Sequence, residues 1–261
     1  MTICTLASSS SGNCSIVSHG NTHILIDAGI SLRRIRTGLH HFGLSPDDLD
    51  GVFVTHEHSD HISGLEMLTK YHKIPVFSSF GGGVGICGAV TWIEPFLSCF
   101  EIGAALEIGD ISVCSFCTPH DAAGSVGYTV LAGGKKFVYV TDLGHVSDVV
   151  AQAAAGADIA MIEANHDIEM LRRGPYPAFL KRRVLSDHGH LANKDSGEFA
   201  AKLADSGTRN IQLSHLSRQN NTPELALATV ERALSAKGIT PARDVDLDVA
   251  PPYEMGRVYV V

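Results

Sequence analysis

The chain lacks the long apolar segments of a membrane protein. No stretch approaches the roughly 18 consecutive apolar residues needed to cross a bilayer, and no charged start is followed by an apolar run. Charged residues make up only 18% of the chain and hydrophobic residues 44%, which is the balance of an ordinary soluble globular protein. We therefore expect a cytoplasmic protein that makes no contact with a membrane.

The chain also has little positive charge. Its 20 lysines and arginines are outnumbered by 28 aspartates and glutamates, which leaves a formal net charge of −8. This balance argues against a protein that binds nucleic acid over its whole surface, although local basic contacts remain compatible with it. Repeats, low-complexity segments and disordered linkers are absent as well. We expect residues 1–261 to form a single domain with one large core.

Cysteine is scarce and scattered, with six copies at positions 4, 14, 87, 99, 114 and 117. Cys114 and Cys117 have the spacing of a CxxC motif, but they fall in a strand-like run at 111–117. Positions three apart in a strand face opposite sides of the sheet, which suits neither a redox pair nor a metal site. We expect reduced thiols that mostly pack in the interior.

Histidine is abundant instead, with 14 copies. The run Thr-His-Glu-His-Ser-Asp-His at 55–61 directly follows an apolar stretch at 51–54. Imidazole nitrogens and carboxylate oxygens are ligands that zinc, manganese and iron accept. His56 and His58 fall on the same side as a strand ends, and a turn after them would point Asp60 and His61 at a second position. A loop of solvated histidines is the alternative, but four potential ligands in six residues favour a metal site.

Three more potential ligands stand where other predicted strands end. His120 follows the strand at 111–117 and would supply a third imidazole to the cation of His56 and His58. Asp142 closes an apolar run at 137–141, where a carboxylate could bridge two cations. His215 closes a run at 211–214 and could complete the second cation. Each of them alone could be a turn or cap residue, so the hypothesis depends on their coming together.

Strand-like and helical segments are mixed along the chain. The predicted strands are 2–6, 14–18, 23–27, 51–55, 74–77, 88–92, 106–108, 111–117, 127–131, 136–140, 159–162 and 210–213. The predicted helices are 31–41, 64–72, 145–155, 167–171, 176–184, 193–205 and 223–236. This pattern favours an α/β fold in which sheets are sandwiched between helices.

These motifs resemble those of the metallo-β-lactamase superfamily. The 56–61 segment resembles its HxHxDH motif, and the later His, the strand-end Asp and the final Ser-His follow in the family's order. Further segments at 10–13, 118–121, 141–144, 163–167, 187–193 and 213–217 resemble the YycJ/WalJ-like branch, whose bacterial members are regarded as DNA exonucleases. The resemblance covers essentially the whole chain. It implies an αββα sandwich of two mixed β-sheets flanked by helices, and DNA as the substrate, while the oligomeric state stays open.

The resemblance also implies roles for individual residues. His56, His58 and His120 would hold one divalent metal ion, Asp60, His61 and His215 would hold another, and Asp142 would bridge the two. The metal could be zinc, manganese or iron. Asp27 resembles the buried carboxylate that orients a ligand imidazole. The implied reaction is phosphodiester hydrolysis by a metal-bridging hydroxide, with Asp60 and His190 as catalytic residues.

Several polar residues near these motifs have less specific assignments. The related tRNase Z enzymes carry a histidine near the position of His190 that is thought to protonate the leaving oxygen. His190 and His188 could instead cap the helix at 193 or bind phosphate. Glu163 and His166 are expected at the rim of the site, and Asn13 lies in a serine-glycine loop that could approach a phosphate.

A basic cluster falls between Asp142 and His190. It contains five of the 20 basic residues within twelve positions, namely Arg172, Arg173, Lys181, Arg182 and Arg183. These side chains could clamp the phosphate backbone of DNA or form a solvated helix surface. Because the ligands alone do not distinguish a phosphate from an ester, two alternatives remain. One is a hydrolase of a small phosphodiester or (thio)ester, and the other is a non-catalytic, metal-binding regulatory protein on the same scaffold.

Overall fold

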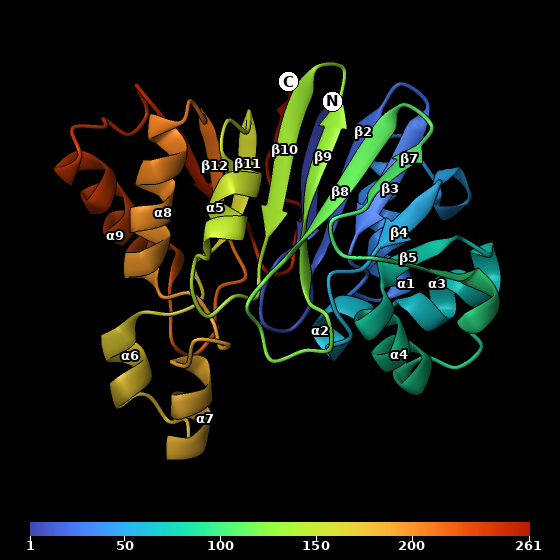
Figure 1. Ribbon diagram of the computed structural model, residues 1–261, viewed down its shortest axis with the longest axis horizontal. Coiled ribbons are helices and arrows are strands. Elements are labelled where there is room, and N and C mark those ends of the chain that lie inside the picture. Colours follow the sequence, from blue (N-terminus) through green and yellow to red (C-terminus); the bar gives the residue numbers. More distant parts are fainter.

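Two seven-stranded β-sheets face each other at the centre of the protein, in a computed structural model that describes residues 1–261 (Figure 1). The first sheet has the strand order β14 (Val258–Val260), β1 (Thr2–Ala7), β2 (Cys14–His19), β3 (Thr22–Ile26), β4 (Gly51–Phe53), β5 (Val76–Ser79) and β6 (Leu97–Phe100). The second has the order β13 (Asp246–Val249), β12 (Asn210–Ser214), β11 (Ile159–Glu163), β10 (Lys135–Val140), β9 (Val126–Ala132), β8 (Ile111–Cys117) and β7 (Ala105–Ile108).

Each sheet is antiparallel in one half and parallel in the other. Strands β14, β1, β2 and β3 pair antiparallel, and β3 to β6 pair parallel. In the second sheet β7 to β10 pair antiparallel, and β10 to β13 pair parallel. The carboxyl ends of parallel neighbours meet at one edge of a sheet. The segments that leave β3, β4, β10, β11 and β12 therefore emerge where polar side chains can converge.

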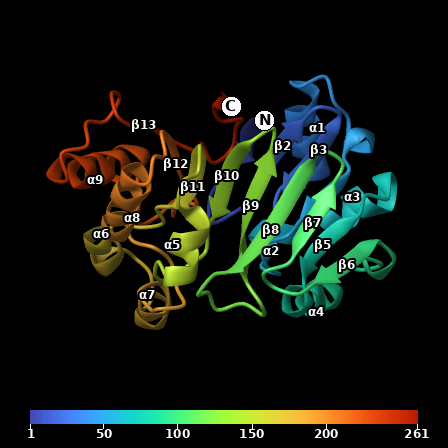
Figure 2. The same cartoon turned by 45° about the horizontal axis from the view of Figure 1, so that its top comes forward.

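Helices cover the outer face of each sheet, as two views of the molecule show (Figures 1 and 2). The first sheet is covered by α1 (Leu32–His40), α3 (Leu65–His72) and α4 (Phe80–Ala89). The second is covered by α5 (Asp148–Ala154), α8 (Asn193–Asp205) and α9 (Pro223–Ala236). The short helices α2 (Ser59–Ile62), α6 (Ile168–Arg173) and α7 (Ala178–Val184) lie at the lower edge in Figure 1. The αββα sandwich of two mixed sheets is confirmed.

Alternation of side chains along the strands builds three apolar layers. In β10, Phe137 and Tyr139 join a cluster of 18 buried residues between the sheets, while Val138 and Val140 join a cluster of 23 under the helices of the second sheet. Another 22 buried residues lie under the helices of the first sheet. Both faces of the central strands are thus apolar, and functional groups are left to the strand ends. None of the helices is both long and apolar enough to span a membrane.

The structure departs from the predicted elements mainly between residues 80 and 100. The strand predicted at 88–92 is wrong, because α4 extends to Ala89 and the strand that follows is β6. Glycine-rich sequence disfavours a helix in isolation, but here it allows close packing. A Cβ on Gly83 would lie 2.4 Å from Cys99 Sγ, and one on Gly81 would lie 2.4 Å from Ala123 O. Tertiary contact with β6 and with the loop between β8 and β9 therefore outweighs the weak helix propensity.

The cysteines are free, as expected, but their predicted burial is wrong. Only Cys4 and Cys14 are buried, whereas Cys87, Cys99 and Cys117 are exposed. All six lack a disulfide partner.

Candidate metal centre

Three imidazoles meet where the 55–61 run leaves β4. His56 Nε2 lies 3.0 Å from His58 Nδ1, and His120 Nε2 lies 3.3 Å from the same atom. His120 arrives on the loop after β8, so the group joins segments from both sheets. The ligand atoms of the three residues all lie within 4.8 Å of one another. We call these residues the histidine trio.

A second group forms on the other side of the same run. Asp60 Oδ2 lies 3.4 Å from His61 Nε2 and 3.2 Å from His215 Nε2. Asp60 and His61 belong to α2, and His215 directly follows β12. We call Asp60, His61 and His215 the mixed trio.

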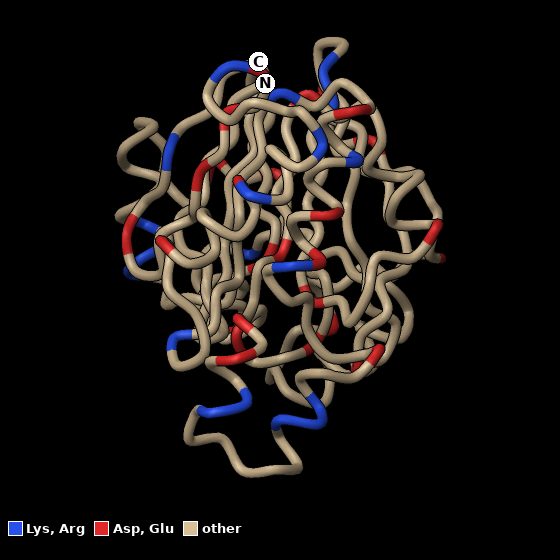
Figure 3. The backbone as a smooth tube through the Cα atoms, turned by 90° about the vertical axis from the view of Figure 1, so that its left-hand side faces the viewer, with Lys and Arg blue, Asp and Glu red and all other residues tan.

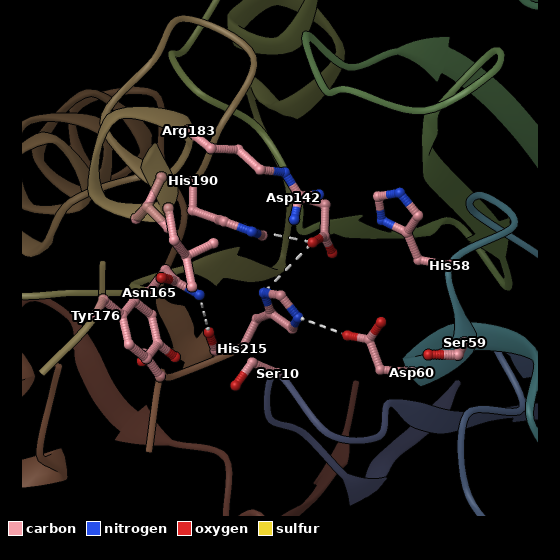
Figure 4. A pocket seen from close by; sticks show the side chains of 13 residues that line it. Ser10, His58, Ser59, Asp60, Asp142, Asn165, Tyr176, Arg183, His190 and His215 are labelled. Atoms are coloured by element: carbon pink, nitrogen blue, oxygen red, sulfur yellow. Dashed lines mark hydrogen bonds and ion pairs between the residues drawn. The ribbon is translucent and has the colours of Figure 1, made fainter. Parts of the chain in front are cut away.

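The carboxylate of Asp142 lies between the two trios. Its Oδ2 is 3.2 Å from His61 Nε2, and its Oδ1 is 3.7 Å from His120 Nε2. Oδ1 is also 3.5 Å from His215 Nδ1. In Figure 4, Asp142 lies between His190 on one side and His58 on the other. One side chain therefore faces ligands of both trios.

Three residues of the site adopt left-handed backbone conformations. Asp27, Asp142 and His215 have φ angles of 59°, 58° and 57°, and they follow the ends of β3, β10 and β12. This conformation costs roughly 1–2 kcal/mol for a residue with a Cβ, and such strain concentrates at functional sites. The sharp turn at the strand end directs each side chain along the edge of the sheets.

A hydrogen bond to Nδ1 orients four of the imidazoles. His61 Nδ1 lies 2.8 Å from Asp27 Oδ2, and both side chains are fully buried. The others follow the same pattern: His56 Nδ1 with Thr55 Oγ1 at 3.0 Å, His120 Nδ1 with Gly189 O at 3.1 Å, and His215 Nδ1 with Glu163 Oε1 at 2.9 Å. A neutral ring that donates from Nδ1 presents the lone pair of Nε2 to the centre, which is how ligand histidines are prepared for a metal.

The donor atoms at the centre fit a divalent cation. Asp142 Oδ2 is buried without a hydrogen-bond donor, and it faces His61 Nε2, whose ring already donates to Asp27. Burial acts to lower the pKa of His61, but Asp27, Asp60 and Asp142 outweigh it and hold that pKa well above its usual value. Three carboxylates therefore favour a positive charge between these atoms. A cation that accepts nitrogen and oxygen ligands, such as zinc, manganese or iron, supplies that charge.

The pKa values of the other histidine ligands shift in both directions. Burial lowers the pKa of His56 well below its usual value, and also lowers the pKa of His120. Burial would raise the pKa of Asp142, but His215 and His61 hold it well below its usual range. Burial would lower the pKa of His215, but Asp142, Asp60 and Glu163 raise it to about 10. Since neutral imidazoles next to ionised carboxylates are the forms that bind metal ions, a metal would displace a proton from His61 and from His215.

A cavity of about 360 Å³ opens over the two trios. Its walls include His58, Asp60, Asp142 and His215 from the centre itself. The remaining lining residues are Ser10, Ser59, Asn165, Tyr176, Leu180, Arg183, Val184, His190 and Ser217 (Figure 4). Helix α7 and the segment before it thus form one wall of the cavity, and the potential metal ligands form another.

His190 lines this cavity and is held from below by Glu163. His190 Nδ1 lies 2.8 Å from Glu163 Oε1, which also contacts His215. The other oxygen of this fully buried carboxylate accepts the backbone N–H groups of Leu143 and Leu191 at 3.0 and 3.1 Å. Burial would raise the pKa of Glu163, but His190 lowers it to about 2. Burial would lower the pKa of His190, but Glu163 raises it above its usual value, so this ring keeps its proton to a higher pH than a free imidazole does.

The other predicted polar residues lie in different surroundings. Asn13 is buried, with Nδ2 3.2 Å from His61 Nε2 and the backbone N–H donating to Asp60 O at 2.8 Å. It supports the mixed trio, and Ser10 is the member of its loop that lines the cavity. His166 is buried with neither ring nitrogen hydrogen-bonded. His188 is exposed, and neither residue lines the cavity.

The predicted basic cluster follows the projecting helices α6 and α7 (Figure 3). Only Arg183 lines the cavity, and its Nη2 donates to Asp121 Oδ1 at 3.0 Å. Arg172 and Arg173 pair with Glu169 at 3.1 and 3.4 Å. Lys181 donates to the carbonyl of Arg172 at 2.7 Å, and Arg182 is exposed. Most of this charge is therefore engaged by neighbouring groups.

Sequence reasoning missed Asn165, Tyr176 and Ser217 in the cavity wall. Asn165 could have been predicted, because side chains of an extended segment alternate between two sides. If the chain stays extended after β11, Asn165 lies on the same side as Glu163, and His166 lies on the opposite side. Asn165 Nδ2 donates to the backbone carbonyl of His215 at 2.9 Å. It thus holds the strand end that carries this ligand.

Comparison with known proteins assigns the chain to a family. A family model described as "Beta-lactamase superfamily domain" matches residues 22–215, a span that includes every residue of both trios and Asp142. The chain belongs to the metallo-β-lactamase superfamily. Among solved structures of this fold, it is similar to the metallo-β-lactamase fold protein YhfI from Bacillus subtilis, with a TM-score of 0.74, 16% identity, and coverage of 99% of this chain and 98% of the other. It is also similar to Zn²⁺-bound PqqB from Methylobacterium extorquens, with a TM-score of 0.71, 18% identity and full coverage of both chains.

Two curated relatives are more similar in sequence. The chain is 38% identical over 236 residues to "Exodeoxyribonuclease YycJ" of Bacillus anthracis, which covers 89% of each chain. It is 38% identical over 235 residues to "Exodeoxyribonuclease WalJ" of Streptococcus pneumoniae serotype 2, which covers 88% of this chain and 87% of the relative. The resemblance to the YycJ/WalJ-like branch is thereby confirmed.

Proposed function

We propose that the chain is a hydrolase that uses two divalent metal ions to cleave the phosphodiester bonds of DNA as an exonuclease. The observation that carries this proposal is the convergence of the histidine trio, the mixed trio and Asp142 on one cavity. The names and near-complete coverage of the two relatives support DNA as the substrate. Six free cysteines support a location in the reducing cytoplasm.

In this proposal the histidine trio would hold one cation and the mixed trio would hold the other, with the Asp142 carboxylate available to both. Bound divalent cations supply a hydroxide nucleophile at neutral pH and neutralise charge on the phosphodiester oxygens. Zinc, manganese and iron all suit the nitrogen and oxygen donors.

The side chains around the cations divide the remaining tasks. His190 holds a proton on the cavity side and gives it to the leaving oxygen, since Glu163 keeps the ring charged and fixes its orientation. Ser10, Asn165 and Ser217 place hydroxyl and amide groups on the cavity wall, where they can donate hydrogen bonds to phosphate oxygens.

A two-substrate assay tests the proposal. Purified protein supplied with manganese is incubated with end-labelled duplex DNA and, separately, with bis-p-nitrophenyl phosphate. We expect nucleotides to be released from the DNA ends, and His58→Ala to abolish turnover of both substrates with loss of metal. His188→Ala is the matched control, because this exposed imidazole lies outside the cavity wall.

Two outcomes would contradict the proposal in different ways. Turnover of the small ester with DNA left intact would identify a hydrolase of small phosphodiesters or (thio)esters. A protein that binds metal but turns over neither substrate would instead be a regulatory protein on the same scaffold.

A further inference from the structure

Three arginines without acidic partners gather around an exposed tyrosine next to the metal cavity. Arg218 and Arg34 have their guanidinium carbons 5.1 and 6.0 Å from the centroid of the Tyr253 ring. Arg33 lies in the same turn of α1 as Arg34. None of the three forms an ion pair with a carboxylate, and Arg36, Arg182, Arg209 and Arg232 form none either. The group is distinguished by its arrangement around one tyrosine ring beside the metal cavity. The only hydrogen bond of its three guanidiniums runs from Arg34 to Pro252 O at 3.4 Å.

These arginines line hollows that continue from the metal cavity. A hollow of about 230 Å³, lined by Arg218 and Tyr253, shares Ser217 with the metal cavity. A third hollow of about 280 Å³, lined by Arg33 and Arg34, shares Tyr253 with the second. Arg218 is three residues beyond the ligand His215, so their Cα atoms are at most about 11 Å apart. Each hollow thus shares a lining residue with the next, from the metal cavity to Arg33 and Arg34, and we call this series of hollows the path.

Local stability does not explain this arrangement. The first turn of α1 contains two arginines and no acidic residue, which opposes the helix dipole. Two guanidiniums beside one ring repel each other, and a cation–π contact at an exposed site contributes only about 0.5–1 kcal/mol. The chain as a whole carries a charge of −8. Positive charge concentrated here without a carboxylate partner is therefore suited to an anion from outside the protein.

We propose that Arg218, Arg34 and Arg33 bind backbone phosphates of the DNA strand whose terminal phosphodiester lies in the metal cavity. This inference rests on the proposed function and specifies where the strand runs. Guanidinium groups match phosphate oxygens in charge and geometry, and Tyr253 holds two of them along the path. Glu254 also lines the third hollow but pairs with neither arginine. The path is a stronger candidate for a phosphate-binding surface than the basic residues of α6 and α7. In that cluster Arg183 already pairs with Asp121, and Arg172 and Arg173 pair with Glu169.

Salt-dependent binding of DNA tests the path. Affinity for a fluorescent oligonucleotide is measured between 50 and 200 mM salt, in a His190→Ala background that slows cleavage. Arg218→Gln and Arg34→Gln should each reduce the slope of log K against log salt by about 0.7–0.9, and weaken binding about five- to eightfold at 0.1 M salt. Arg218→Lys should keep the slope, since it keeps the charge.

Arg257→Gln is the matched control. Arg257 also lies 5.1 Å from a tyrosine ring, that of Tyr259, but it pairs with Asp246 at 2.6 Å. This variant loses the same charge and the same kind of aromatic contact, and it should bind DNA like the parent protein. Equal weakening in Arg257→Gln and Arg218→Gln would overturn the inference, because net charge alone would then account for binding.

The outcomes separate this inference from the proposed function. If both glutamine variants keep the parent's slope while the wild-type chain degrades DNA, the path is wrong and the exonuclease proposal stands. If the parent protein does not bind DNA at any salt concentration, both proposals fail. Circular dichroism of each variant identifies any loss that comes from unfolding, and Arg34→Gln tests the path independently if Arg218→Gln unfolds.

Discussion

At the scale of single residues, Glu163 joins His190 to the potential ligand His215. Its Oε1 contacts the Nδ1 atoms of both His190 and His215, but only His215 turns its Nε2 to Asp60 and the mixed trio. His190 lines the cavity and belongs to neither trio, although its Nδ1 also lies 3.5 Å from Asp142 Oδ1 and it forms a further group of potential ligands with Asp142, Glu163 and His215. The same carboxylate thus orients both imidazoles, which in the proposed function serve as a metal ligand and as a proton donor.

His190→Ala should therefore keep its metal and slow DNA cleavage by about 10²–10⁴-fold, the contribution of a positioned general acid. In the wild-type protein, Glu163 raises the pKa of His190, so the protonated ring is lost as the pH rises through that pKa, and cleavage falls with it. The variant should lack this decline. Turnover measured across pH, together with elemental analysis, checks both statements. Loss of metal from His190→Ala would contradict the assignment.

His166 should make folding sensitive to acid. Burial lowers its pKa to about 4, below the usual value near 6.5, so between these values the unfolded chain binds more protons than the folded one. The free energy of unfolding should therefore fall as the pH drops from about 6.5 to 4, by up to about 3 kcal/mol from this residue. His166→Leu should remove this pH-dependent contribution to the free energy of unfolding. Urea unfolding of the wild-type protein and the His166→Leu variant, both treated with chelator, measures the free energy of unfolding at several pH values. If the two free energies change with pH in parallel, the prediction is wrong.

The potential ligands were easier to predict from sequence than the residues that orient them. His56, His58, Asp60 and His61 are neighbours in the chain, so their spacing alone indicates a metal site. The partner of Nδ1 in His120 is a backbone carbonyl, Gly189 O, which no side-chain pattern reveals. The unpaired state of Arg218 was equally invisible, because it depends on which carboxylates fold close to it.

At the scale of elements, the loop after β3 supports the segment that carries Asp60. Gly29 donates its N–H to Asn13 O at 2.7 Å, and Asn13 donates its own N–H to Asp60 O at 2.8 Å. A Cβ on Gly29 would lie 1.6 Å from Asp60 O, a backbone atom that cannot rotate away. The mixed trio therefore depends on a glycine that is not itself a ligand.

Gly29→Ala should destabilise the fold by roughly 1–3 kcal/mol or more and weaken metal binding, because the Asp60 backbone must move. Gly88→Ala is the control: a Cβ there meets nothing within 4 Å in α4, and alanine should stabilise that helix by up to about 1 kcal/mol. Chemical denaturation and a metal titration of both variants provide the comparison. Equal stability of the two variants would show that the close approach at Gly29 has no importance.

Helices with an amphipathic pattern were predicted well, and the exception has a physical cause. The bounds of α8 and α9 match the predicted 193–205 and 223–236, since buried residues such as Val230 and Leu234 recur with helical spacing. Helix α4 lacks that spacing. Its glycines stabilise the helix only by allowing close contact with β6. This contact between two separate elements cannot be predicted from the local sequence.

At the scale of the whole molecule, the two sheets make the site possible. Each brings the carboxyl ends of its parallel strands to the same edge, and the trios draw residues from loops of both sheets. The apolar layer between the sheets also takes residues from both halves of the chain. We propose on this basis that residues 1–261 form one domain, in which loss of either sheet would dismantle the metal centre.

The central claim is that His56, His58, Asp60, His61, His120, Asp142 and His215 together hold two cations. Anomalous diffraction from crystals grown with manganese tests it most directly. The account predicts two anomalous peaks per chain, one beside each trio, with the Asp142 carboxylate between them. A single peak, or peaks remote from these side chains, would contradict it.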